Sequence, residues 1–322
     1  MKAAVYYETG EPDVFRYEEV PDPVCEPGGV VIDVKAVSIE GGDTLNRLGG
    51  AMAGRPHVVG YQCAGVIAEV GPGVEDRAVG QRVVCTGIHG SHAEKRALPA
   101  ATTWVIPDEL DLSRAACVPI AVGTADDCLF EFGRLQEGES VLVHAGAGGV
   151  GMAAIQLAKQ AGATVLATAS SDEKLARLGE FGLDHGINYA ETDFVAAARD
   201  LTGGRGPDLV VDSVGGRTLQ GSMECAAYRG RIISVGGAGR DAFTPDVSVL
   251  RPANKTLTGV FLGAELVFQT GRVHPMIQNH LQAVADAKLR IEIDRSYPLS
   301  AAAEAHAYVE SRKAFGRVLL IP

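Results

Sequence analysis

The segment that decides the fold runs Val141-Leu142-Val143-His144-Ala145-Gly146-Ala147-Gly148-Gly149-Val150-Gly151. A short apolar stretch, predicted as a strand, leads into the pattern G-x-G-x-x-G, and a helix is predicted from Val150 to Ala161. In this pattern the first glycine makes a tight turn, the second lets the backbone approach a pyrophosphate, and the third lets helix and strand pack closely. The start of the helix adds unpaired N–H groups and a partial positive charge. The segment predicts a dinucleotide-binding loop built from Gly146, Gly148, Gly149, Val150 and Gly151, and the alternative is a purely structural turn.

Strands and helices alternate on the C-terminal side of this loop. A parallel sheet covered by helices on both faces is the architecture that such alternation favours. The predicted strands are 164–169, 209–212 and 231–235, with a helix over 172–181.

The two ends of the chain have a different character. Partly alternating β-branched segments broken by turn clusters occupy the first hundred residues, for example 30–37 and 63–70. After about residue 260 the sequence is mixed, with helices predicted over 273–287 and 301–312 and a last strand over 317–321. We therefore predict an α/β fold in which a doubly wound parallel-sheet domain (residues 117–260) is inserted into a β-rich domain (residues 1–116 and 261–322).

The end of the second predicted strand indicates which dinucleotide binds. An NAD enzyme places a carboxylate there for the ribose 2′-hydroxyl, about 20 residues beyond the loop. This sequence has Ser170 and Ser171 instead, whereas Asp172 comes slightly late and is expected to cap the next helix. Lys174 follows one turn later, where its charge suits a 2′-phosphate. These residues favour NADPH, and the alternative for Lys174 is a solvated helix lysine.

Composition excludes several classes of partner. The chain has 29 Lys and Arg against 40 Asp and Glu, a net charge of −11, which argues against nucleic acid and anionic membranes. No apolar run reaches the ~18 residues that span a bilayer. The six cysteines are scattered and no secretory signal is found at the N-terminus, so we expect a reducing, cytoplasmic location.

Several further motifs carry a resemblance that runs from end to end. They are Asp172-Glu173-Lys174, Gly186-Ile187-Asn188-Tyr189, Asp212-Ser213-Val214-Gly215-Gly216 and the terminal Gly316-Arg317-Val318-Leu319-Leu320. Together they resemble the medium-chain dehydrogenase/reductase superfamily, and more narrowly its zinc-independent quinone oxidoreductase (ζ-crystallin-like) branch. The resemblance implies a Rossmann domain inserted into a GroES-like catalytic domain, and a homodimer.

Zinc-dependent members of that superfamily carry a cysteine, a His-Glu pair and a four-cysteine lobe. Here Glu40 stands where the first cysteine would be, and Tyr61-Gln62 replaces His-Glu. The lobe is missing, and His89 and His92 have no flanking cysteines, so we expect an exposed loop there and no metal.

Tyr61, Gln62 and Glu40 are the candidate catalytic residues. The resemblance implies that Tyr61 and Gln62 face the nicotinamide as hydrogen-bond donors; the alternative is that they are wall residues of an apolar cleft. Glu40 is either a proton relay or a carboxylate occupied by Arg47 or a backbone amide. The branch normally has Asn-x-x-Asp where this chain has Glu40 to Asp43, and a tyrosine where Leu45 stands, which puts the substrate in doubt.

The resemblance also implies further cofactor contacts. Thr124 is expected near the nicotinamide or ribose and Tyr189 against the adenine, whereas Asp212 is expected to be structural. The remaining expected contacts are Gly236, Gly237, Phe261 and Leu262 at the carboxamide and Arg312 at the 2′-phosphate or substrate mouth.

Without a Lewis acid, alcohol oxidation loses its main driver, whereas hydride transfer from NADPH to an electrophilic carbon remains feasible. Quinones and α,β-unsaturated carbonyls are suitable small-molecule acceptors. Two other functions stay open: an enoyl-thioester or biosynthetic tailoring reductase, and a largely non-catalytic NADPH-binding protein.

Overall fold

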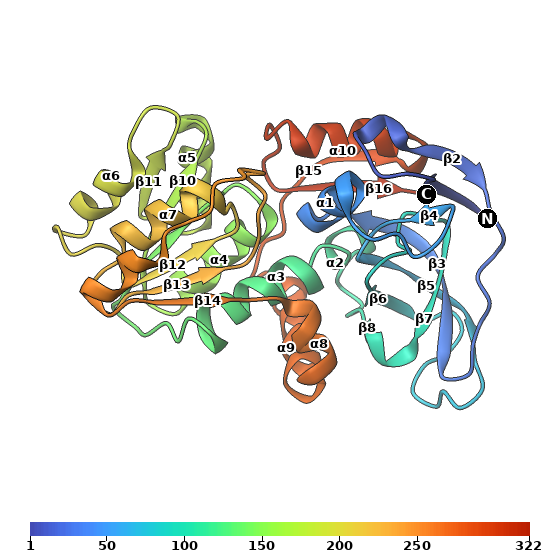
Figure 1. The fold of residues 1–322 in the computed structure, drawn as a ribbon. Coiled ribbons are helices and arrows are strands. Elements are labelled where there is room, and N and C mark those ends of the chain that lie inside the picture. The colour runs from blue at the N-terminus through green and yellow to red at the C-terminus, as the bar shows by residue number, and fades with distance from the viewer. The chain divides into compact units, whose positions relative to one another are not determined.

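The computed structural model describes residues 1–322, which form two compact units. Unit 1 contains residues 1–121 and 266–322, and unit 2 contains residues 122–265. Both chain ends therefore belong to unit 1, as the labels in Figure 1 show. This confirms the predicted fold class, an α/β domain inserted into a β-rich domain.

Unit 2 is built on a six-stranded sheet in which every neighbouring pair is parallel. The strand that precedes the glycine-rich loop, β9, lies in the middle, so the chain winds outward from it in both directions. In spatial order the strands are β11 (His185–Asn188), β10 (Thr164–Ala169), β9 (Ser140–Val143), β12 (Leu209–Asp212), β13 (Arg231–Ser234) and β14 (Thr256–Gly259).

Sequence explains why these strands lie inside. All four residues of β9 and of β12 are buried, and such continuous apolar runs are typical of a parallel sheet covered on both faces. Leu142, Val210 and Ile232 form one core cluster with residues of the flanking helices. The helices between the strands are α4 (Gly149–Gln160), α5 (Asp172–Leu178), α6 (Phe194–Leu201) and α7 (Gly216–Cys225).

Unit 1 contains a seven-stranded sheet and a three-stranded antiparallel sheet. The larger sheet has the order β15 (Ile293–Pro298), β16 (Arg317–Ile321), β3 (Gly29–Ser38), β5 (Gln62–Val70), β6 (Arg82–Thr86) and β8 (Thr103–Val105), with β7 (Lys95–Pro99) paired to β3. The smaller sheet has the order β2 (Arg16–Glu19), β1 (Lys2–Tyr6) and β4 (His57–Val58).

The last strand, β16, pairs with β3 and so joins the two ends of the chain in one sheet. The only tryptophan, Trp104, is buried on β8 and donates a hydrogen bond from Nε1 to the carbonyl of His274 at 2.9 Å. The remaining helices of the chain are α1 (Gly41–Gly49), α2 (Leu112–Ala115), α3 (Pro119–Asp126), α8 (Leu262–Phe268), α9 (Thr270–Ala285) and α10 (Ala302–Glu310). None of the chain's helices has both the length and the apolar character needed to cross a bilayer.

Candidate functional site

The glycine-rich loop follows β9 directly and has no room for side chains at two of its glycines. A Cβ on Gly146 would lie 2.9 Å from the Cβ of Ala167, and a Cβ on Gly151 would lie 2.4 Å from the carbonyl oxygen of Ala145. The left-handed residue of the turn is Ala145, with φ of 53°, rather than a glycine. Helix α4 therefore begins in direct contact with the backbone of the loop.

The start of α4 fits a pyrophosphate. Gly148 precedes the helix, and a Cβ built on it would have only the Ala145 oxygen, at 3.3 Å, within contact range. The N–H groups of Gly149, Val150 and Gly151 occupy the first turn, where no carbonyl of the same helix can accept from them. The result is an open cradle of N–H groups at the positive end of a twelve-residue helix.

At the end of β10, Ser170 and Ser171 offer hydroxyl groups, whereas the carboxylate of Asp172 bonds elsewhere. Ser171, not Asp172 as predicted, caps α5, because its Oγ accepts from the N–H of Lys174 at 3.4 Å. Asp172 instead accepts a hydrogen bond from Nδ2 of Asn188 at 3.1 Å. Ser170, Ser171 and Lys174 are all half-buried. This edge therefore presents two hydroxyls and an ammonium group, a set that suits a 2′-phosphate.

Tyr189 lies beside this edge. Its N–H donates to the carbonyl of Ala169 at 3.2 Å, and its side chain is 43% exposed, so the ring is accessible to an adenine. Thr124 lies on α3 and is largely buried. Arg312 belongs to unit 1, where it follows α10 with a positive φ of 59°.

The remaining predicted cofactor residues follow β13 and β14. Gly236 packs closely against the loop after β12, where a Cβ would lie 3.3 Å from the carbonyl oxygen of Ser213, whereas Gly237 has open space around it. Phe261 is 71% exposed and Leu262 is buried. The loop, Ser170, Tyr189 and these residues thus follow the carboxyl ends of strands of one parallel sheet, where α/β proteins of this kind bind ligands.

Sequence reasoning missed a buried polar network beneath the loop. His144 shares hydrogen bonds with Thr168 Oγ1 (3.1 Å) and Ser222 Oγ (3.0 Å), and Ser222 donates to Asp212 at 2.8 Å. The other oxygen of Asp212 accepts from the N–H groups of residues 214 and 215, both at 2.8 Å. The network joins the ends of β9, β10 and β12, which agrees with the structural role expected for Asp212.

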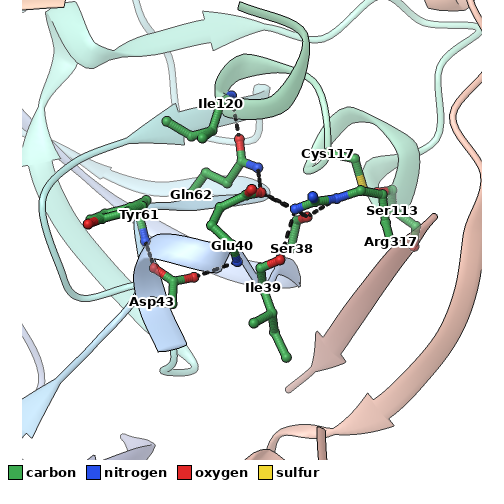
Figure 2. Close-up of polar contacts among 10 residues, drawn as sticks. All are labelled: Ser38, Ile39, Glu40, Asp43, Tyr61, Gln62, Ser113, Cys117, Ile120 and Arg317. Carbon is green, nitrogen blue, oxygen red and sulfur yellow. Dashed lines mark hydrogen bonds and ion pairs between the residues drawn. The ribbon is translucent and has the colours of Figure 1, made fainter. Parts of the chain in front are cut away.

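In unit 1, Glu40 is buried within a second network (Figure 2). Its Oε1 forms an ion pair with Nη2 of Arg317 and accepts from Nε2 of Gln62. Arg317 also donates to Ser38 Oγ (2.6 Å) and to the carbonyl of Ile39 (2.9 Å). Burial raises the pKa of Glu40, while the charge of Arg317 and the hydrogen bonds oppose that rise.

Arg47 is not the partner of Glu40, contrary to one of the two alternatives considered from the sequence. Arg47 is fully buried, and its guanidinium forms an ion pair with Glu310 and donates to the carbonyl of Gly10 at 2.8 Å. Arg317 was missed because it stands at the other end of the chain. Its only signal in the sequence is an arginine at the start of an otherwise apolar last strand.

Gln62 is fully buried and uses both ends of its amide inside the chain. Besides donating to Glu40, it accepts from the N–H of Ile120, at the start of α3, at 3.0 Å. Its geometry therefore matches neither a donor free to meet a substrate nor an apolar wall. Gln62 links the Glu40–Arg317 pair to the start of α3.

The backbone of Tyr61 is fixed by the buried carboxylate of Asp43. Asp43 accepts from the N–H of Glu40 at 2.9 Å and from the N–H of Tyr61 at 3.1 Å. Burial, and next the charge of Glu40, raise the pKa of Asp43 to about 8. The Tyr61 ring lies over Gly42, where a Cβ would come within 2.3 Å of it, so this contact requires a glycine.

The Tyr61 hydroxyl has no hydrogen-bond partner in the chain, and the side chain is half-buried. Burial, and next the negative charges of Asp43 and Glu40, raise the pKa of Tyr61. The hydroxyl thus stays protonated and can donate. Of the three predicted catalytic residues, which the structure does bring together, only Tyr61 is half-buried rather than buried, and its hydroxyl makes no hydrogen bond within the chain (Figure 2).

The prediction of an exposed loop at His89 and His92 is correct for His89 and wrong for His92. His89 is exposed, but His92 is fully buried, and its Nε2 lies 3.0 Å from Nε2 of His306. Burial lowers the pKa of His92 to about 3. No group of three or more His, Cys, Asp or Glu side chains in the chain is arranged to hold a metal ion.

Two family models match the chain. Residues 26–108 match the alcohol dehydrogenase GroES-like domain, and residues 149–279 match the zinc-binding dehydrogenase family. The first match lies in unit 1, and most of the second lies in unit 2.

The relatives that match over the whole chain belong to a narrower class of proteins than the two family models. A 2-haloacrylate reductase from Burkholderia sp is 33% identical over 100% of this chain and 99% of its own length. The structure of Escherichia coli quinone oxidoreductase complexed with NADPH superimposes with a TM-score of 0.95 at 27% identity, covering 100% of both chains. A phenolphthiocerol/phthiocerol polyketide synthase chain from Mycobacterium tuberculosis is 32% identical over 99% of this chain, which spans 15% of that protein. The chain therefore belongs to the medium-chain dehydrogenase/reductase superfamily, in its quinone oxidoreductase branch.

Proposed function

We propose that this chain transfers a hydride from NADPH to quinones or to double bonds activated by a carbonyl group, with Tyr61 as the hydrogen-bond donor to the substrate oxygen. The observation that carries the proposal is the unpartnered Tyr61 hydroxyl beside a network in which Glu40 and Gln62 are already occupied. The chain is an NADPH-dependent oxidoreductase, and its reductase relatives over the full length support this class of acceptor.

NADPH supplies the hydride when it is bound. We propose that the N–H groups at the start of α4 hold its pyrophosphate, and that Ser170, Ser171 and Lys174 hold its 2′-phosphate. Tyr189 would stack on the adenine. Thr124, the loop after β13 and Phe261-Leu262 remain proposed contacts of the nicotinamide half, and Arg312 remains a proposed contact of the 2′-phosphate or substrate.

Tyr61 acts on the charge that develops during the reaction. Hydride arrival at a conjugated carbon moves negative charge onto the carbonyl oxygen, and a preorganised donor stabilises that charge. Because the pKa of Tyr61 is raised, its hydroxyl provides a hydrogen bond rather than an acid proton, and water completes the proton transfer. Asp43 fixes the Tyr61 backbone, and we assign positioning roles to Glu40 and Gln62.

The test is the variant Tyr61→Phe, with Tyr17→Phe as the matched control because Tyr17 is 37% exposed on β2 of the same unit. Loss of one essential oxyanion donor lowers kcat by about 10²–10³-fold. For Tyr61→Phe we expect kcat for enone and quinone reduction to fall by about 10- to 10³-fold, with unchanged NADPH affinity. Full turnover by Tyr61→Phe would contradict the role of Tyr61, and alcohol oxidation without any reduction of enones or quinones would contradict the proposed reaction.

A second candidate function is reduction of enoyl thioesters. It is favoured by the similarity to a polyketide synthase along 99% of the chain. Comparison of kcat/KM for 1,4-naphthoquinone, a simple enone and an enoyl thioester separates the two. A preference for the thioester of more than a hundredfold would support the second function, and binding of NADPH without any turnover would identify a non-catalytic binder.

The assembly and location follow as further parts of the proposal. We propose a homodimer, since β14 is an edge strand whose outer backbone groups are unpaired within the sheet and can pair with a second copy. All six cysteines lack disulfides, which favours a cytoplasmic location. We also propose that residues 1–116 with 261–322 and residues 117–260 act as the catalytic and cofactor domains.

A further inference from the structure

Two buried cysteines face each other across neighbouring strands of unit 1. Cys63 on β5 and Cys85 on β6 are register partners, and neither is exposed to solvent. Their sulfur atoms lie 3.3 Å apart. Facing residues of antiparallel strands have Cα atoms ~4.5–5.5 Å apart, which lies within the range that a disulfide bridges. The pair can therefore be oxidised with only a small movement of the side chains.

A buried cation lies against both sulfurs. Nη1 of Arg96, on β7, is 3.7 Å from Sγ of Cys85 and 3.9 Å from Sγ of Cys63. Arg96 is 4% exposed, and no carboxylate lies within ion-pair distance of it. Its other acceptors are neutral carbonyl groups, those of Tyr61 (3.0 Å), Gly60 and His89.

A buried guanidinium without an anion is costly, because arginine cannot lose its proton inside a protein. The two thiols are the groups in contact with Arg96 that can supply a negative charge. The hydrogen bond from Cys63, and next the charge of Arg96, lower the pKa of Cys85 to about 7, whereas the pKa of Cys63 is raised. The geometry thus divides the pair into a thiolate and a thiol that donates to it.

We propose that Cys63, Cys85 and Arg96 form a reactive dithiol site that hydroperoxides oxidise to an intramolecular disulfide. The Cys85 thiolate attacks one oxygen of hydrogen peroxide and breaks the O–O bond, giving a sulfenic acid and a hydroxide ion that takes up a proton to form water; an organic hydroperoxide releases an alcohol instead. The Cys63 sulfur then attacks Sγ of Cys85. The sulfenic hydroxyl leaves as a second water with the proton of Cys63, so that two thiols are oxidised as one peroxide is reduced.

The dithiol site lies beneath an exposed segment of the chain. Gly87, Ile88 and His89 are exposed, and Gly87 lies directly over the guanidinium, since a Cβ there would meet Nη2 of Arg96 at 2.7 Å. The cover at this point is a glycine backbone without a side chain. The site also lies next to Tyr61, whose carbonyl accepts from Arg96, but the inference does not depend on the reductase function.

The experiment treats the folded wild-type protein with hydrogen peroxide at pH 7, blocks the remaining thiols after denaturation, and maps the cysteines by mass spectrometry. We expect a linked Cys63–Cys85 peptide that has lost two hydrogens. Cys225, which is buried and has a pKa raised to about 12 by that burial, should remain reduced. In the variant Cys63→Ser, which has no resolving thiol but keeps a hydrogen-bond donor beside Cys85, a sulfenic acid on Cys85 should be trapped when the oxidised protein is denatured in dimedone.

The role of the cation is tested with Arg96→Gln. At pH 7 a pKa near 7 gives about fifty times more thiolate than a pKa near 9, and the lower intrinsic nucleophilicity of the more acidic thiol reduces this advantage to about five- to tenfold. Because the hydrogen bond from Cys63 remains in Arg96→Gln, disulfide formation should slow by at most that factor. Lys95→Gln is the matched control, because Lys95 neighbours Arg96 on β7 but points to the exposed face, where it pairs with Asp22.

Three results would overturn the proposal. The first is that Cys63 and Cys85 both remain free thiols under conditions that fully oxidise Cys25, the one cysteine that is not buried. The second is that the disulfide forms as fast in Arg96→Gln as in Lys95→Gln. The third is that dimedone present during denaturation labels no sulfenic acid on Cys85 of oxidised Cys63→Ser, a result that would stand even if Arg96→Gln did not fold.

Discussion

The buried pair of Glu40 and Arg317 should be the strongest electrostatic contribution to the stability of unit 1. Its side chains are only 6% and 9% exposed, and it joins the segment after β3 to the last strand of the chain. The substitution Arg317→Met keeps much of the apolar stem and removes the charge. It leaves the Glu40 carboxylate buried with the hydrogen bonds of Gln62 and Ser38 but without a cation.

Removing one partner of a buried ion pair costs about 3–5 kcal/mol. We expect the lower end, about 3 kcal/mol, because Glu40 keeps the donor Gln62 and can take up a proton in the variant. The double variant Glu40→Gln/Arg317→Met should lose less than the sum of the two single losses, since neither buried charge remains. The matched control is Lys288→Met, whose pair with Asp286 has side chains 71% and 35% exposed and should contribute at most about 1 kcal/mol.

The assay uses the single tryptophan of the chain. Trp104 is buried in unit 1, so its fluorescence during urea unfolding reports the unfolding of unit 1 rather than that of unit 2. With a slope of about 1–3 kcal/mol per molar urea, a loss of 3 kcal/mol moves the midpoint by about 1–3 M. The reasoning is refuted if Arg317→Met and Lys288→Met shift the midpoint equally, or if the losses of Glu40→Gln and Arg317→Met add in the double variant.

Four further predictions concern the cofactor, two buried titrating groups and the metal. Lys174→Ala should weaken NADPH binding about tenfold in a fluorescence titration and leave NADH unchanged; equal losses for both would contradict its role. Since the folded pKa of Asp43 is raised, its protonated form stabilises the fold at low pH, and wild type should lose about 1 kcal/mol relative to Asp43→Asn from pH 7 to pH 9 in urea unfolding. The pH dependence of stability has the opposite sign for His306, because burial lowers the pKa of its side chain in the folded state. Wild type should lose stability relative to His306→Phe as pH falls from 7 to 5, and parallel pH profiles would exclude this. Metal analysis should find no stoichiometric zinc, and one tightly bound zinc per chain would refute the metal-independent reaction.

The fold could be predicted from the sequence because its signals are local. The strand over Thr164–Ala169 and the last strand over Arg317–Ile321 have the predicted bounds, and the helix after the glycine-rich loop is displaced by one residue. Apolar runs, glycines at tight contacts and their order along the chain are sufficient for such elements. The cap of α5 was assigned one residue late because Ser171 and Asp172 are both good capping residues, and which of them caps depends on whether Asn188 competes for the carboxylate.

The candidate site was only partly predictable because its decisive partners are distant in sequence. Arg317 and Glu40 are separated by 277 positions, and His92 and His306 by 214. Spacing along the chain carries no information about such pairs. Tyr61 and Gln62 were singled out together, yet only the structure distinguishes a hydroxyl without a partner from a buried amide that bonds at both ends within the chain.

The residues that replace the zinc-ligand pattern make sense as a set. A carboxylate at position 40 needs a buried cation and a second donor, and Arg317 and Gln62 provide them. A glutamate at position 62 would repel Glu40 and would also lose the N–H donor, whereas an amide can donate to Glu40 and accept from Ile120 with its other end. Because these groups bond to one another within the chain, we propose that Glu40 and Gln62 position the site rather than contact a substrate. The backbone of the neighbouring Tyr61 is bonded to Asp43 on α1, and we propose that Tyr61 is the residue of this group that stabilises a developing oxyanion.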